Sequence, residues 1–207
     1  DLAKHAQDVG ADAILSITPY YNKPTQEGLY QHYKAIANSV EIPFMMYNVP
    51  GRTGVDLDAN TTIRLFDDIK NIYGVKEATG SLERAICLLS QRKDFVVVSG
   101  DDAIDFPMLA NGAKGIISVT ANLLPNLKSQ LVNSVFKGDL EKARQINEDL
   151  YSLNSVLFCE SNPIPIKAAM YLAGLLDTLE YRLPLTAPSM ETMKKLEKTL
   201  EKYEVIK

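Results

Sequence analysis

The sequence predicts an α/β fold in which a parallel sheet is followed by a helical carboxy-terminal part. Short apolar runs alternate with segments of helical periodicity, and this unit repeats five times at intervals of roughly 25 to 30 residues. The apolar runs are nearly continuous, which is typical of strands buried on both faces. Beyond Pro125 only helical patterns follow.

Five apolar runs are the predicted strands, and helical segments separate them. The strands are expected at 13–17, 43–49, 71–78, 95–99 and 115–119. Apolar residues recur at helical spacing across 29–40, 63–69 and 82–89, and a shorter helix ends near Asn111. Ser81 is placed to cap the helix over 82–89.

Four further helices are expected in the carboxy-terminal part. They begin after Pro125, after Asp139, at 162–165 and at Ser189. Proline suits the first turn of a helix, so the segment 162–165 is interpreted as a helix start. The expected domains are a partial barrel over 1–124, and the last barrel helix with a helical extension over 125–207.

Five strand-and-helix units are too few to close a (β/α)8 barrel, which typically needs about 250 residues. The chain opens with a segment over 2–9 that has the pattern of the tail of an amphipathic helix and leads into the first strand. We therefore expect the chain to be the carboxy-terminal part of a longer protein, lacking about three units.

Composition excludes several functional classes. The 207 residues carry a net charge of −4 with scattered Lys and Arg, which argues against a nucleic-acid interface. No run approaches the roughly 18 apolar residues of a membrane span, and the start lacks the pattern of a signal peptide. Cys87 and Cys159 lack metal-ligand spacing and are expected to be reduced core residues. The sequence thus predicts a cytoplasmic protein with no metal site.

Lys76 is the residue that points to chemistry. It lies in the third apolar run, where a lysine is costly to desolvate unless the protein uses it. Bringing its pKa near 7 needs a preference for the neutral form of about 4 to 5 kcal/mol, which burial with no carboxylate on the same face could supply. Because side chains alternate along a strand, Gly74 and Ala78 share its face and leave room for a substrate, whereas Glu77 points the other way. A neutral lysine amine attacks carbonyl groups to form a Schiff base.

Other polar residues follow the strands at their carboxyl ends, where functional residues gather in parallel α/β folds. Tyr20, Tyr21 and Tyr47 are candidates for a proton relay, since imine formation must expel water. Each could equally be a rim residue that packs its ring and exposes its hydroxyl. Arg52, on a glycine-flanked turn, could bind a substrate carboxylate through its two-pronged guanidinium, or be a solvated loop charge.

Several motifs in order resemble the dihydrodipicolinate synthase family, within the superfamily of pyruvate-dependent class I aldolases that includes N-acetylneuraminate lyase. They cover nearly the whole chain, at 18–22, 47–54, 74–80, 99–102, 115–120 and 162–167. The resemblance implies a (β/α)8 barrel with a carboxy-terminal helical extension. It also implies a lyase that condenses pyruvate with aspartate-4-semialdehyde to 4-hydroxy-tetrahydrodipicolinate, in diaminopimelate and lysine biosynthesis.

The resemblance also implies roles for individual residues. Lys76 would form the imine with pyruvate, so no separate cofactor is needed, and Tyr47 would relay protons. Tyr21 would complete the relay across a dimer contact, and Arg52 would hold the carboxylate of the semialdehyde. The remaining implied positions are the backbone of Gly100 and Ile117 at the pyruvate end of the pocket, and Tyr20 at a lysine feedback site.

Family members are usually homotetramers built as dimers of dimers, so the same assembly is expected here. A family loop that binds the pyruvate carboxylate has no counterpart in this chain, so this piece alone is expected to lack a complete site.

Two alternatives remain open at this stage. One is another pyruvate-dependent aldolase, acting on N-acetylneuraminate or a keto-deoxy-sugar acid. Those enzymes share the lysine and tyrosine but lack the arginine of the turn, so Arg52 favours the short carboxylated aldehyde. The other is a non-catalytic piece of barrel that keeps the motifs by descent. A phosphate-binding barrel is weaker, because no glycine-rich phosphate loop surrounds the last strand.

Overall fold

The computed structural model describes residues 1–205, in which the chain forms two compact units, Asp1–Ile117 and a second that begins at Ser118. The division falls just after the fifth strand. The domain boundary expected after residue 124 stays a prediction.

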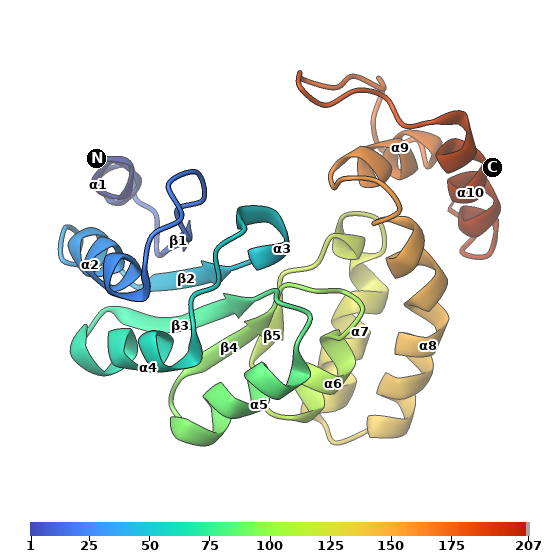
Figure 1. Ribbon diagram of the computed structural model, residues 1–207. Helices are drawn as coiled ribbons and strands as arrows, with labels where there is room; N and C mark the ends of the chain where they lie inside the picture. Colours follow the sequence, from blue (N-terminus) through green and yellow to red (C-terminus); the bar gives the residue numbers. More distant parts are fainter. Residues whose placement is uncertain (206–207) are drawn as a thin grey trace. The chain divides into compact units, whose positions relative to one another are not determined.

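The first unit contains a five-stranded sheet, and all strands are parallel in the order β1-β2-β3-β4-β5 (Figure 1). The strands are β1 (Ile14–Ile17), β2 (Phe44–Asn48), β3 (Ile72–Glu77), β4 (Val96–Ser99) and β5 (Gly115–Ile116). All five predicted strands are therefore confirmed. The fifth is shorter than expected, because the chain leaves the sheet after Ile116 and enters a 3-10 helix at Thr120.

Helices cover one face of this sheet (Figure 1). They are α2 (Gln26–Ala37), α4 (Ala59–Asp68), α5 (Leu82–Gln91) and α6 (Asp105–Ala110). Side chains of the four helices and of the inner strands form a single buried core, with Leu29, Phe44, Leu65, Leu88 and Met108 among its members.

Two further helices lie in the first unit. The short helix α3 (Pro50–Thr53) was not expected, because its four residues are too few to show a periodic pattern. The helix α1 (Leu2–Asp8) is present as expected. None of its residues is buried here, although the sequence has an amphipathic pattern.

Alternation along the strands divides the sheet into two chemically different faces. Phe44, Met46 and Val75 are fully buried in the core beneath the helices. The opposite face carries Tyr47 and Lys76, both partly buried, together with the more exposed Leu15 and Ile17. The chemistry suggested by the sequence therefore lies on the face that helices α2, α4, α5 and α6 do not cover.

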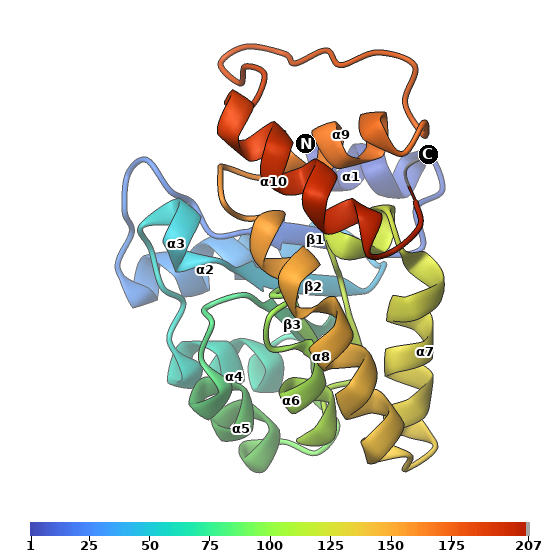
Figure 2. The ribbon, with the colours of Figure 1, turned by 90° about the vertical axis from the view of Figure 1, so that its right-hand side faces the viewer.

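The second unit is helical. After the 3-10 helix η1 (Thr120–Asn122) come α7 (Pro125–Phe136), α8 (Leu140–Val156), α9 (Ile164–Leu172) and α10 (Met190–Glu201), which confirms the four expected helices. Residues of α8, α9 and α10 share one buried core (Figure 2). Its fully buried members include Leu153, Ala169 and Leu196.

The two cysteines are free, but they are not core residues as expected. Cys87 is partly buried because it lies at the border of the buried stripe of α5, and Cys159 is exposed in the turn that follows α8. Across residues 1–205, no helix is both long enough and apolar enough to cross a bilayer.

Candidate active site

Lys76 and Tyr47 form the centre of the candidate site. They lie on neighbouring parallel strands, where their Cα atoms are direct register partners. The Nζ atom of Lys76 lies 4.2 Å from the centroid of the Tyr47 ring. The two candidates that the sequence separates by a whole strand-and-helix unit are thus side by side, as a nucleophile and its proton relay require.

The environment of Lys76 favours the neutral amine. Partial burial lowers the pKa of Lys76 from its usual value, and the positive charge of Arg52 lowers this pKa further. The charge of Asp102 acts in the opposite sense and raises the pKa of Lys76. Asp102 follows β4 in the chain and is almost fully buried, so its carboxylate opposes part of the effect of burial on Lys76.

Glycine is required at position 100, because the backbone there lies very close to the side chain of Lys76. A Cβ atom built on Gly100 would lie 2.7 Å from Cε of Lys76 and 2.9 Å from Cβ of Ala78. The backbone N–H of Gly100 donates to the carbonyl of Glu77 at 2.8 Å, which ties this residue to the end of β3. The backbone after β4 thus forms a wall against the stem of the lysine.

Gly74 has a different role from the one the sequence suggested. A Cβ atom there would lie 2.2 Å from the backbone oxygen of Val96. The space on that side of Gly74 is thus filled by β4, and does not accommodate a substrate. Glycine is needed at this position because the two strand backbones approach so closely.

Arg52 is exposed on α3. Hydrogen bonds of the next residue, Thr53, stabilise the turn in which it lies. The Thr53 hydroxyl donates to the carbonyl of Val55 at 2.8 Å and accepts from the N–H of Val55 at 3.2 Å. The turn ends at Gly54, whose φ of 65° is a left-handed conformation that favours glycine. Burial raises the pKa of Tyr47, and the Arg52 charge lowers it, so the guanidinium acts electrostatically on both central residues.

The other predicted residues lie apart from this centre. Tyr20 and Tyr21 follow β1 in a loop, and their side chains are 62% and 95% exposed. Within residues 1–205, no hydrogen bond or ring contact joins either tyrosine to Lys76. Ile117 ends the first unit, and its backbone N–H donates to the carbonyl of Ser99 at 2.8 Å. The structure therefore brings together Lys76, Tyr47 and Gly100, with the charge of Arg52 acting on them.

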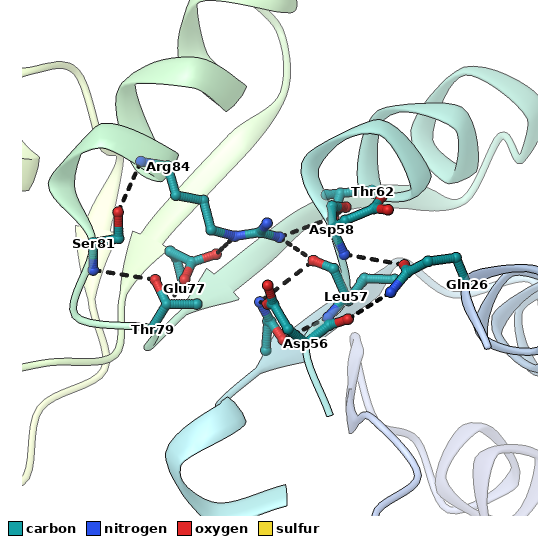
Figure 3. Close-up of polar contacts among 10 residues, drawn as sticks. Gln26, Asp56, Leu57, Asp58, Thr62, Glu77, Thr79, Ser81 and Arg84 are labelled. Carbon is teal, nitrogen blue, oxygen red and sulfur yellow. Dashed lines mark hydrogen bonds and ion pairs between the residues drawn. The ribbon is translucent and has the colours of Figure 1, made fainter. Parts of the chain in front are cut away.

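Sequence reasoning missed residues that support the site from the helix-covered face. Glu77, which was expected only to point away from Lys76, is buried there, and its carboxylate accepts from Nε of Arg84 at 2.8 Å (Figure 3). Arg84 carried no signal, because it lies on the first turn of a helix whose one other charged residue, Glu83, is exposed to solvent. Among the described residues, no group of three or more His, Cys, Asp or Glu side chains is placed to hold a metal ion.

A model described as the dihydrodipicolinate synthetase family matches residues 1–203. The chain belongs to this family. A 4-hydroxy-tetrahydrodipicolinate synthase of Aliarcobacter butzleri is 78% identical over 207 residues, which are 100% of this chain and 70% of that protein. The chain thus spans about 70% of the length of this family member.

Solved structures of the dihydrodipicolinate synthase family superpose closely on the chain. The Acinetobacter baumannii synthase, described as chloride inhibited and complexed with pyruvate, is 48% identical with a TM-score of 0.95. The match covers 99% of this chain and 70% of that one. The Cyanidioschyzon merolae protein, with lysine bound, is 35% identical with a TM-score of 0.93, and the match covers 99% and 69%.

These matches confirm the family suggested by the sequence motifs. They also confirm the fold class, an α/β fold in which an incomplete (β/α)8 barrel is followed by carboxy-terminal helices. The expected enzyme class, a lyase of the dihydrodipicolinate synthase family, is confirmed as well.

Proposed function

We propose that Lys76 of this protein forms an imine with pyruvate, which then condenses with L-aspartate-4-semialdehyde to give 4-hydroxy-tetrahydrodipicolinate. The observation that carries the proposal is the pairing of a partly buried lysine amine with the Tyr47 ring, 4.2 Å away, on neighbouring strands. Burial favours the neutral amine, which is the nucleophilic form.

The chemistry proceeds in four steps. The Lys76 amine attacks the keto carbon of pyruvate, and the carbinolamine loses water to form the imine. Loss of a methyl proton gives the enamine, whose carbon attacks the aldehyde carbon of the semialdehyde. Tyr47 accepts and returns protons in these steps and donates one to the aldehyde oxygen. The amino group of the second substrate then attacks the imine carbon, closes the ring and releases Lys76. The imine is the only covalent group required, so no separate cofactor is proposed.

The remaining residues bind and orient the substrates in this proposal. Arg52 pairs with the carboxylate of the semialdehyde, since its guanidinium is exposed and acts electrostatically on both Tyr47 and Lys76. The backbone at Gly100 and Ile117 lines the pyruvate end. A sugar-acid lyase would have no need of a cation at Arg52, and the relatives that match the chain carry the synthase name.

Borohydride trapping tests the central step. The full-length protein is incubated with pyruvate and borohydride, and the adduct is located by mass spectrometry. We expect one reduced pyruvate adduct on Lys76 and none in Lys76→Ala, which should also lose condensation. Lys70→Ala is the matched control, because Lys70 is exposed and precedes the same strand. An adduct that persists in Lys76→Ala, or full condensation by that variant, would refute the proposal.

We further propose that Tyr21 completes the proton relay in the site of a neighbouring subunit, within a homotetramer built as a dimer of dimers. The side chain of Tyr21 is 95% exposed, which suits a residue that acts across a subunit contact. Mixing Lys76→Ala with Tyr21→Phe subunits tests this. Hybrid dimers contain one intact site if Tyr21 acts in the neighbour, so activity should return on mixing. No gain on mixing would contradict the arrangement.

Tyr20 is proposed as part of a site for the feedback inhibitor lysine, and the protein as cytoplasmic. The exposed phenol of Tyr20, next to Tyr21, is accessible to a small ligand. Calorimetry with L-lysine should show binding that Tyr20→Ala weakens, whereas absence of binding would remove this part of the proposal.

A further inference from the structure

A connected set of buried polar groups lies directly behind the Tyr47–Lys76 pair. Asn48 and Glu77 are the next residues along β2 and β3, and their Cα atoms are register partners as well. Because side chains alternate, both point to the helix-covered face, where Asn48 is 0% and Glu77 is 1% exposed.

The carboxylate and the backbone carbonyl of Glu77 together bind three other segments of the chain. One oxygen accepts from the backbone N–H of Thr79 at 2.9 Å, in the loop after β3. The other accepts from Nε of Arg84, on α5, at 2.8 Å. The backbone carbonyl of Glu77 accepts from Gly100, whose backbone lies against the Lys76 stem. The orientation of β3 at Lys76 is therefore fixed from three directions.

Asn48 and Arg84 meet at Leu57. The backbone N–H of Leu57 donates to Oδ1 of Asn48 at 3.1 Å, and Nδ2 of Asn48 donates to the Leu57 carbonyl at 3.4 Å. The same carbonyl accepts from Nη2 of Arg84, which also donates to the Thr62 hydroxyl at 3.2 Å. Figure 3 shows Arg84 extended between Glu77 and Leu57.

This connection also closes the loop that carries Arg52. Residues 49–56 leave β2 after Asn48 and return at Leu57, so the two hydrogen bonds between Asn48 and Leu57 join the ends of the loop. The side chain of Arg84 is only 11% exposed, so water offers it little replacement for a lost partner. Removal of the Glu77 or the Arg84 charge would leave the other charge buried without its partner. The remaining side chain could reach water only if the surrounding segments shifted.

We infer that Asn48, Arg84 and Glu77, joined through Leu57, are positioning residues that hold Tyr47, Lys76 and the Arg52 loop in one fixed geometry. None of the three touches the reacting atoms; they act through the residues next to them. This inference rests on the proposed function, because the geometry that it preserves is that of the imine-forming pair.

The test compares Glu77→Gln, Arg84→Met and Arg84→Lys in the full-length protein. Loss of geometry at the reacting pair should lower kcat for condensation, and the rate of borohydride trapping, by roughly 10- to 100-fold. The KM for pyruvate should change much less. Arg84→Lys should recover part of the loss, because it keeps the charge but not the two-pronged geometry.

The pH profile separates positioning from simple loss of stability. Burial is the main cause of the lowered Lys76 pKa, so a loosened site that admits water should raise this pKa toward its usual value. The acid limb of kcat/KM should then move to higher pH in Glu77→Gln and Arg84→Met. Leu88→Ala is the stability-matched control, since Leu88 is a fully buried core residue of the same helix. It should lower the melting temperature and leave kcat and the acid limb unchanged.

Two results would overturn the inference. One is a folded Glu77→Gln or Arg84→Met variant with wild-type kcat and pH profile. The other is a Leu88→Ala variant that shows the same loss of kcat and the same pH shift. Thr62→Val serves if those variants do not fold. It removes one hydrogen bond of Arg84, together with the bond from the Thr62 hydroxyl to the Asp58 carbonyl at the start of α4, and leaves the Glu77–Arg84 ion pair in place. A few-fold lower kcat supports the inference, and an unchanged kcat opposes it. Failure of the wild-type protein to trap pyruvate would refute the proposed function instead.

Discussion

Replacement of Gly100 by alanine is the most direct perturbation of Lys76 that leaves the lysine in place. The added methyl group would lie 2.7 Å from Cε of Lys76, whereas ordinary contacts begin at 3.4 Å, so one of the two must move by about 0.7 Å. Ala78 blocks the other direction at 2.9 Å. The lysine stem is the more flexible partner, and we expect the amine to be displaced from the Tyr47 ring.

The displacement should lower both catalysis and stability. A misplacement of about 1 Å at a reacting group can cost roughly 100-fold in rate, so we expect a loss of about 10- to 100-fold in kcat. Overpacking against the Lys76 stem and the Cβ atom of Ala78 should also lower the free energy of unfolding, by about 1 to 3 kcal/mol.

The rate of borohydride trapping with pyruvate measures the effect on catalysis, and a thermal melt measures the effect on stability. Gly115→Ala is the matched control, because its new methyl group would meet only Val98 at an ordinary 3.8 Å. Wild-type trapping by Gly100→Ala would refute the argument that the wall after β4 sets the position of the amine. An equal loss in Gly115→Ala would refute it too.

Three further predictions follow from the same unit. Gly74→Ala forces a methyl group against the backbone of Val96, which cannot move aside as a side chain can. The free energy of unfolding, measured by denaturant titration, should therefore fall by about 3 kcal/mol. An unchanged denaturation midpoint would contradict the close approach of the two strands. Asp102→Asn removes a negative charge that raises the pKa of Lys76, so the acid limb of the pH profile of kcat/KM for pyruvate should move to lower pH. A shift to higher pH would contradict this effect of Asp102 on the Lys76 pKa. Thr25→Ala removes the hydroxyl that caps α2 through the N–H of Gly28, and should cost about 1 kcal/mol in stability with kcat unchanged.

The order and type of the elements could be predicted from the sequence, because strands and helices of this fold have strong local patterns. Near-continuous apolar runs marked the strands, and Ser81 marked the start of α5, where its hydroxyl accepts from the N–H of Arg84 at 3.2 Å. The positions of Lys76 and Tyr47 at strand ends followed from these patterns, since parallel strands place their carboxyl ends at one edge.

The groups that tune and support the site could not be predicted in this way. The effect of Asp102 on Lys76 and the contact between Arg84 and Leu57 depend on how separate elements pack, and residue spacing carries no information about such contacts. Gly74 shows the same limit: its small size was visible in the sequence, but the strand backbone that fills the space beside it was not.

The strict two-residue alternation at the ends of β2 and β3 makes the enzyme sensitive to changes in chain length. A deletion of one residue within β3, before Lys76, would turn every later side chain of that strand to the opposite face. Lys76 would then be buried beneath α5, and the carboxylate of Glu77 would take its place on the face that carries Tyr47. Viable sequence change in these strands is therefore confined to exchanges of side chains, while insertions and deletions can accumulate in the loops that precede the strands, at the opposite edge of the sheet from Lys76 and Arg52.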